Sequence, residues 1–195
     1  MAQKSKAHFG CGTGGGRCVY QKGCARKIDN NDLVQIAFDE NPGAQIIYKP
    51  HPEILHGTRR NHSNPDDVRH LCLILKQDIA LADAFETVDH VYTITSLSGF
   101  EALIRGCKVS CIGMPFYAGW GVTDDRQTCT RRTATRTVEE IFAAAYILYP
   151  RYFDPMLRTE LNFEEALDLL GRMKLEQAPK DTKTGRRNGR ALPRL

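Results

Sequence analysis

The sequence predicts an α/β protein in which a parallel β-sheet carries helices on both faces. Short apolar segments, several of them β-branched, alternate with amphipathic segments between Leu33 and Ile112. The connections between them are short and carry Gly, Pro, Asn and Ser, which are typical of turns. A strand, a helix and a second strand in this order form a βαβ unit, whose strands are parallel. Repetition of the unit predicts a layered sheet.

The first half of this region predicts one helix and two strands. Asn31-Asp32 caps a helix with one apolar face, and Asn41-Pro42-Gly43 ends it. A short apolar strand is expected over residues 44–48, and Lys49-Pro50-His51-Pro52 follows it. Residues 71–75 are a second candidate strand.

The second half continues the alternation. It predicts a helix over 78–88, a β-branched strand over 90–95, a helix over 100–105 that ends at Gly106, and a strand over 108–112. The strand residues expected in the core are Ile46, Ile47, Val91, Ile94, Val109 and Ile112.

Two later helices are expected to serve as scaffold. Thr137 with Glu140 and Asn162 with Glu165 have the spacing of N-terminal capping boxes. In the first of these helices an apolar stripe should form along one face, from Ile141, Ala144, Ala145 and Leu148.

The net charge of +4 is unevenly distributed along the chain. Residues 1–28 carry +6 and residues 175–195 carry +4, which leaves the middle of the chain acidic. We therefore expect a folded lobe over 29–174 between a disordered or aberrant basic Gly/Cys-rich segment over 1–28 and a disordered basic tail over 175–195. An acidic core does not favour a nucleic-acid-binding protein, which needs clustered cations on its docking surface.

The apolar runs and the cysteines favour a cytoplasmic protein. No run approaches the roughly 18 apolar residues of a membrane span, and no signal-peptide apolar core follows Met1. Seven cysteines without a Cys-x-x-Cys pair are a poor disulfide framework. The spacing of Cys11, Cys18 and Cys24 does not match a zinc knuckle, so no metal is expected.

Three segments are expected at the carboxyl ends of strands, where open α/β sheets bind ligands: Lys49–Pro52, Ser96–Gly99 and Gly113–Gly121. Ser98 and Glu101 fit a capping box. The same helix start offers hydroxyls, free amides and a glycine that would let a phosphate approach. Capping alone, and capping with phosphate binding, both stay open.

The other two segments add charge and aromatic surface. Two prolines present His51 in an extended conformation beside Lys49, where its ring can donate to an anion, although a lone histidine is more often structural. The loop around Tyr117, Trp120 and Asp124 combines aromatic rings, glycines and acids, as sugar or nucleotide sites do. A loop that closes one end of the core would also contain such rings.

Four motifs together resemble the capsule polysaccharide biosynthesis and export family, and within it the KpsC/LipA-type β-Kdo glycosyltransferases. They are Lys49-Pro50-His51-Pro52, Thr95–Leu103, Pro115–Arg126 and Leu148–Tyr152, in the family's order. The resemblance covers about residues 30–173.

The resemblance implies a GT-B-like architecture of two Rossmann-like lobes, of which this chain looks like the second, nucleotide-binding lobe. Its substrates would be CMP-Kdo and a lipid-linked saccharide acceptor, without a cofactor, and the capsule export machinery at the inner membrane would be a partner, with peripheral association there. Tyr117, Trp120 and Asp124 would contact sugar. The donor CMP would be bound by Lys49, His51, Pro52, Ser96, Ser98, Gly99 and Glu101.

Residues 1–28 depart from the family. They carry neither the acceptor-side lobe nor the Gln-Val segment with an acidic residue that the resemblance leads one to expect, so the catalytic residues are expected in a missing lobe. A shifted reading frame or a truncated gene would give such a start. Two alternatives therefore stay open: an inactive nucleotide-binding or assembly fragment of the capsule machinery, and another GT-B-like enzyme such as a sugar-nucleotide epimerase.

Overall fold

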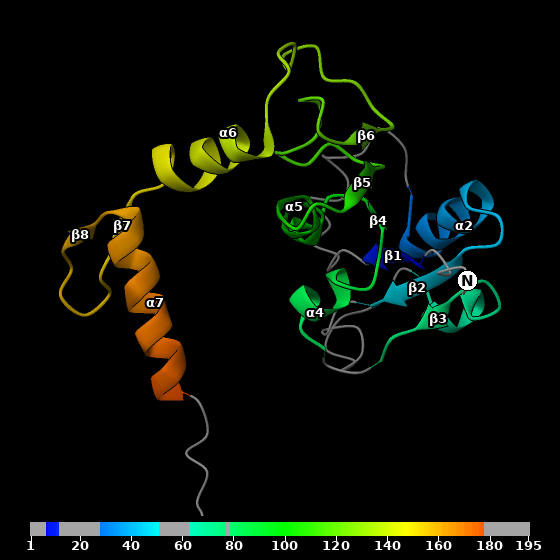
Figure 1. Cartoon of the computed structure of the whole chain (residues 1–195), viewed down its shortest axis with the longest axis horizontal. Helices are drawn as coiled ribbons and strands as arrows, with labels where there is room; N and C mark the ends of the chain where they lie inside the picture. Colours follow the sequence, from blue (N-terminus) through cyan, green and yellow to red (C-terminus); the bar gives the residue numbers. More distant parts are fainter. Residues whose placement is uncertain (1–6, 12–27, 51–62, 77–78, 178–195) are drawn as a thin grey trace, which may run out of the picture. The chain divides into compact units, whose positions relative to one another are not determined.

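The computed structural model describes residues 7–11, 28–50, 63–76 and 79–177 (Figure 1). The chain divides into two compact units, Met1–Phe142 and Ala143–Leu195. The lobe expected over 29–174 therefore extends over parts of both units, which are described one after the other.

The first unit is built on a six-stranded sheet whose hydrogen-bonded neighbours all run parallel. The strand order is β3-β2-β1-β4-β5-β6, the order of Rossmann folds. The parallel α/β fold expected from the sequence is thus confirmed. The strands are β1 (Ala7–Cys11), β2 (Gln45–Lys49), β3 (Leu73–Ile74), β4 (His90–Thr93), β5 (Lys108–Cys111) and β6 (Asp124–Asp125).

Strand β1 corrects the expectation that residues 1–28 lack regular structure. It lies at the centre of the sheet, with Phe9 opposite Ile47 of β2 on one side and Val91 of β4 on the other. Its sequence, Ala-His-Phe-Gly-Cys, contains no β-branched residue and gives no strand pattern. A central strand paired on both sides does not need the polar alternation of an exposed one, which explains the missed prediction.

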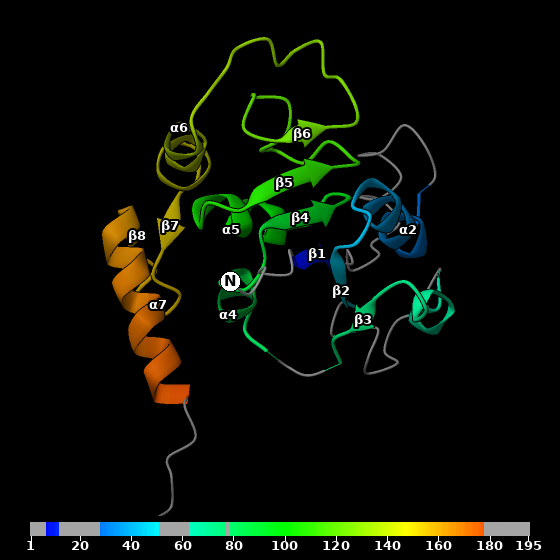
Figure 2. The same cartoon turned by 45° about the vertical axis from the view of Figure 1, so that its right-hand side comes forward.

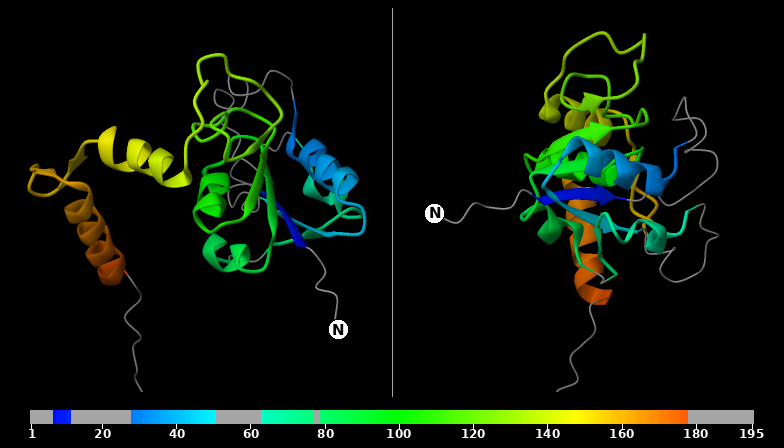
Figure 3. Two further views of the ribbon diagram at one scale, coloured as in Figure 1. Left: turned by 45° about the horizontal axis from the view of Figure 1, so that its top comes forward. Right: turned by 90° about the vertical axis from the view of Figure 1, so that its right-hand side faces the viewer.

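Helices cover both faces of the sheet, as Figure 3 shows. Helix α2 (Asn30–Glu40) contacts β1 and β2 on one face, and α5 (Leu97–Ile104) contacts β4 and β5 on the other, where α4 (Leu81–Phe85) lies beside it. A 3₁₀ helix, η1 (Pro65–Val68), packs against α2. Helix α6 (Val138–Phe142) ends the unit.

Alternation along the strands builds a core on each face. Val91 and Val109 point to the α5 face, whereas Ile94 and Ile112 pack with Leu33 of α2 on the other face. The core predicted from the sequence is buried, except that Ile47 is half-buried.

The described part of the second unit, residues 143–177, is small. It contains a π-helix (Ala143–Leu148), a two-stranded antiparallel ribbon of β7 (Tyr152–Phe153) and β8 (Glu160–Leu161), and α7 (Phe163–Gln177). Arg151 and Glu160 hold the ribbon by a two-pronged ion pair with N–O distances of 2.8 and 2.9 Å.

Both capping boxes predicted for the later helices are present. The Glu140 amide donates to the Thr137 hydroxyl, and the Thr137 amide donates to the Glu140 carboxylate. Asn162 and Glu165 make the same two reciprocal bonds between amides and side chains. The apolar stripe predicted from Ile141 is wrong, because Leu148 is 80% exposed. The Tyr149 amide donates to the Ala144 carbonyl, five residues back, so the π-helical turn moves the side chains off the 3.6-residue period.

Candidate functional site

The carboxyl edge of the sheet collects the ends of β2 and β4. Cys11, the last residue of β1, lies opposite both Lys49 and Thr93, so these two residues stand in one row across three strands. Figure 2 shows β4 and β5 pointing to this edge. The strand order reverses between β1 and β4, and open α/β sheets bind ligands in the crevice at such a point.

The turn from β4 into α5 is fixed by hydroxyl groups. The Ser96 amide donates to Thr93 Oγ1 at 3.1 Å. Ser96 Oγ in turn accepts from the Ser98 amide at 3.3 Å and from the Ser98 hydroxyl at 2.7 Å. Two serine side chains and the beginning of a helix therefore meet just beyond the carboxyl end of β4.

The capping box predicted from Ser98 and Glu101 is wrong. Ser96 is the N-cap of α5, two residues earlier than expected, and Ser98 is buried inside the first turn. The third helical residue is then Gly99, which has no side chain to complete a box. Glu101 is half-buried within the helix, and its carbonyl accepts from Arg105.

The other predicted donor-binding residues lie at the end of β2. Lys49 is its last residue and is buried at 7% exposure. His51 and Pro52 lie outside the described residues. Of the predicted donor-binding set, the structure thus places two parts on one edge of the sheet. They are Lys49 and the turn from Ser96 to Ser98, called the serine turn below.

Tyr117 packs the loop over Gly113–Gly121, called the aromatic loop below, against the serine turn. Its ring is fully buried and stacks on Phe100 of α5, with the ring centroids 5.6 Å apart. Its hydroxyl donates to the Ser96 carbonyl. The loop and the turn therefore contact each other through Tyr117. Because the Tyr117 ring is buried, the aromatic ring that the loop exposes beside it is Phe116, at 40% exposure.

Trp120 is held by contacts within the loop. Its indole Nε1 donates to the Phe116 carbonyl at 2.9 Å, and the guanidinium of Arg132 lies 5.7 Å from the ring centroid. Arg132 also donates to the carbonyls of Pro115 and Ala118, at 2.6 and 2.5 Å. Arg132 is not among the residues predicted from the sequence. Its acceptors are backbone carbonyls, which every residue has, so no sequence motif indicates these bonds.

Asp125 and two glycines complete the loop. The Asp125 carboxylate accepts from the Gly119 amide at 2.8 Å and from the Thr123 hydroxyl at 2.7 Å. Gly119 and Gly121 have φ angles of 80° and 85°, a left-handed conformation that glycine adopts without strain. The loop conformation is thus specified by its own residues.

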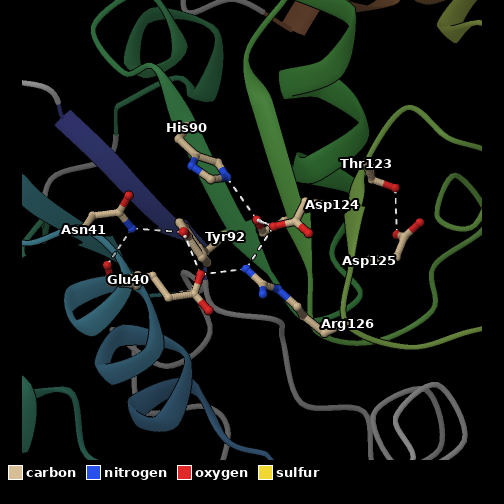
Figure 4. A network of polar contacts seen from close by, with 10 residues as sticks. Glu40, Asn41, His90, Tyr92, Thr123, Asp124, Asp125 and Arg126 are labelled. Atoms are coloured by element: carbon tan, nitrogen blue, oxygen red, sulfur yellow. Dashed lines mark hydrogen bonds and ion pairs between the residues drawn. The ribbon is translucent and has the colours of Figure 1, made fainter.

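Asp124 belongs to a separate polar network, shown in Figure 4. Its carboxylate accepts from Ser110 at 2.8 Å and pairs with Arg126 at 2.9 Å, and His90 contacts the same serine hydroxyl at 3.0 Å. Arg126 reaches on to Glu40 at 2.6 Å. The contacts of Asp124 are therefore with this network rather than with the serine turn.

The network continues through the end of α2. Tyr92 donates to Glu40 at 3.0 Å and accepts from Asn41 at 2.9 Å (Figure 4). Burial raises the pKa of the Tyr92 hydroxyl, which is protonated at neutral pH even without this shift. These contacts tie α2 to β4, β5 and β6 on the face of the sheet opposite α5.

Two cysteines at β5 are core residues: Cys107 precedes the strand and Cys111 ends it. Cys107 and Cys111 are both buried. Burial raises the pKa of the Cys111 thiol to about 12, so the thiol stays protonated at physiological pH and is a poor nucleophile.

Two features are absent from the residues that the structure describes. Among these residues, no group of three or more His, Cys, Asp or Glu side chains could hold a metal ion. No helix in the described part of the chain is long and apolar enough to cross a membrane.

Comparison with known proteins identifies the family. The sequence profile of the family described as "Capsule polysaccharide biosynthesis protein" matches residues 19–152, which is more than half of the chain. The chain belongs to this family. The resemblance found in the four sequence motifs is therefore confirmed.

Curated relatives carry names from the same area. The chain is 54% identical over 145 residues to the lipopolysaccharide-processing protein LpsZ of Rhizobium meliloti. It is 41% identical over 145 residues to the capsule polysaccharide modification protein LipA of Neisseria meningitidis serogroup A. These alignments cover 74% of this chain but 33% and 21% of the relatives, so the chain spans a third or less of their length.

Two solved structures share the fold. The KpsC β-Kdo 2,4 transferase of Thermosulfurimonas dismutans matches with a TM-score of 0.77 and 33% identity, over 87% of this chain and 53% of that one. The β-Kdo 2,7 transferase of the same organism matches with a TM-score of 0.77 and 31% identity, over 89% and 55%. The fold class is thus that of a KpsC glycosyltransferase, consistent with a GT-B-like architecture.

Proposed function

We propose that this chain carries the donor-binding part of a β-Kdo glycosyltransferase of capsule assembly, and that the turn between β4 and α5 binds the phosphate of CMP-Kdo. The Ser96–Ser98 turn at the point where the strand order reverses carries this proposal. Similarity to the two KpsC transferases supports the substrate class.

The start of α5 is suited to an anion. A helix start carries partial positive charge and free amides, and the first turn of α5 contains no acidic residue to offset it. Helix α2 starts at the same edge, but Asp29 and Asp32 already cap it. Of these two helix starts, α5 is therefore the one that favours a phosphate.

The proposed chemistry transfers Kdo from CMP to an acceptor hydroxyl. The bond between the anomeric carbon of Kdo and the phosphate oxygen of CMP-Kdo breaks, a bond between this carbon and the acceptor oxygen forms, and the hydroxyl proton passes to a basic residue of the complete enzyme. CMP then leaves as a phosphate monoester. Fixed donors on the phosphate stabilise the charge that develops on this leaving group. The Ser96 hydroxyl and the Leu97 amide would supply them, because the Ser98 hydroxyl and amide already donate to Ser96 Oγ. Lys49 and His51 would be additional donors.

Calorimetric titration with CMP and with cytidine tests the proposal. Each charge-assisted hydrogen bond contributes about 1.5–3 kcal/mol, so CMP should bind roughly 10- to 150-fold more tightly than cytidine. Ser98→Ala should remove about tenfold of this preference, because its hydroxyl orders the turn. Ser110→Ala is the matched control and should leave the preference unchanged, since Ser110 contacts Asp124 in the separate network. Equal affinity of the wild type for CMP and cytidine would exclude the phosphate site.

A further inference from the structure

Tyr117 lies against the start of α5, inside the protein. Its hydroxyl donates to the Ser96 carbonyl, which also accepts from the Gly99 amide at 3.2 Å. We infer that Tyr117 is a positioning residue, whose hydroxyl holds the serine turn in the orientation that receives the phosphate, and that Gly99 is the residue that makes room for it. This inference rests on the proposed function.

Gly99 is required by the position of the Tyr117 hydroxyl. A methyl group built on Gly99 would overlap this hydroxyl and would lie 2.8 Å from Thr93 Cγ2, closer than carbon atoms approach in proteins. The space above Gly99 is thus already occupied by protein. The glycine admits the tyrosine hydroxyl, whereas the sequence suggested that it admits a phosphate.

The Tyr117 contact determines which way the first amide of α5 points. The Ser96 carbonyl and the Leu97 N–H belong to one peptide unit, and in a planar trans peptide they point in opposite directions. Because the fully buried Tyr117 holds the carbonyl from inside, the Leu97 amide is directed away from the tyrosine. Leu97 as a whole residue is 49% exposed.

The remaining polar groups of Ser96 are also engaged. Its amide donates to Thr93, and its hydroxyl oxygen accepts from Ser98. The contact between the aromatic loop and Ser96 is therefore made at the Ser96 carbonyl, which accepts from the Tyr117 hydroxyl. Loss of the Tyr117 hydroxyl would leave the peptide unit between Ser96 and Leu97 freer to rotate, and the phosphate would meet a less ordered donor.

Tyr117→Phe tests this role, because it removes the hydroxyl and keeps the ring that stacks on Phe100. The affinity ratio of CMP to cytidine should fall about three- to tenfold, an amount expected for one hydrogen bond, while the affinity for cytidine stays the same. Tyr152→Phe is the matched control. Its hydroxyl also donates to a backbone carbonyl, that of Tyr146 at 2.7 Å, but in the second unit, and its removal should not change the ratio.

Gly99→Ala is the second variant and does not remove the hydroxyl. Its methyl group should displace the Tyr117 hydroxyl and lower the same ratio, and circular dichroism should show that the variant stays folded. An unchanged ratio in a folded Tyr117→Phe or Gly99→Ala variant would overturn the inference.

The Leu97 amide gives a readout that needs no ligand. In nitrogen-15 NMR spectra of the full chain, Tyr117→Phe should shift the Leu97 resonance and speed its hydrogen exchange, and Tyr152→Phe should do neither. A wild type that binds CMP and cytidine equally would contradict the proposed function alone. An unperturbed Leu97 amide in Tyr117→Phe would contradict the positioning role.

Discussion

Arg132 fixes the aromatic loop through groups that have no side-chain signature. Its guanidinium donates to the carbonyls of Pro115 and Ala118 and lies over the Trp120 ring. One cation thus holds the two ends of the segment that carries Tyr117. The position of Tyr117 beneath the serine turn depends on a residue fifteen positions further along the chain.

Arg132→Met keeps much of the apolar stem and removes both hydrogen bonds. Hydrogen bonds from charged groups contribute about 1.5–3 kcal/mol each, but less where the charged group is partly exposed, as Arg132 is. We therefore expect the free energy of unfolding to fall by about 2 kcal/mol. Urea unfolding followed by circular dichroism measures it. The neighbouring, exposed Arg131→Met should stay within about 0.5 kcal/mol of the wild type. Equal effects of the two substitutions would show that Arg132 does not hold the loop.

The residues of the site could be predicted to different extents. Ser96 and Ser98 were found because a strand end followed by Ser and Gly is a local pattern. The burial of Tyr117 was not, because a ring spaced by glycines looks the same whether it faces a ligand or packs on Phe100 from another segment. The network that holds Asp124 was missed for the same reason, since Glu40 and Arg126 are far apart in sequence.

At the scale of elements, α2 and α5 start at the same edge of the sheet but differ in electrostatics. The Asp29 carboxylate accepts from the amides of Asn31 and Asp32, at 2.8 and 3.0 Å, and the Asp32 carboxylate accepts from the Asp29 amide at 2.9 Å. In α2, acidic side chains therefore accept the hydrogen bonds of the amides at the helix start. Helix α5 is capped by the neutral Ser96.

Asp29→Ala should therefore affect stability and leave ligand binding unchanged. Loss of an N-cap costs about 1 kcal/mol of unfolding free energy, which chemical denaturation can measure. Asp39→Ala is the control on the same helix, because Asp39 makes an exposed contact with Gln35, and it should change stability by less than about 0.5 kcal/mol. A decrease in the CMP preference in Asp29→Ala would mean that α2, too, contributes to the phosphate site.

The elements themselves followed the sequence closely where their pattern was periodic. Helix α2, the strands β2, β4 and β5, and the capping boxes of the later helices were all predicted within a few residues. Strand β1 was not, because Gly and Cys within it hide its strand character and its partners β2 and β4 come much later in the chain. The π-helical turn after α6 could not be foreseen from a 3.6-residue stripe.

At the scale of the whole molecule, the strand order explains why the site lies where it does. The sheet extends from β1 toward β2 in one direction and from β4 toward β5 in the other, so the turn after β4 lies where the strand order reverses. The structural match covers 53% and 55% of the lengths of the two KpsC transferases. The proposed binding of the donor would take place at the carboxyl edge of the sheet, at the turn after β4.

Amide NMR tests most directly whether the phosphate of CMP binds at the start of α5. In a titration of the nitrogen-15-labelled chain with CMP, the largest amide shifts should occur at Leu97 and Ser98, and cytidine should not reproduce them. The amides of His90 and Asp124, in the separate polar network, should remain near their starting positions. Shifts by CMP that are largest at His90 and Asp124, or that are the same with cytidine at Leu97 and Ser98, would contradict phosphate binding at the start of α5.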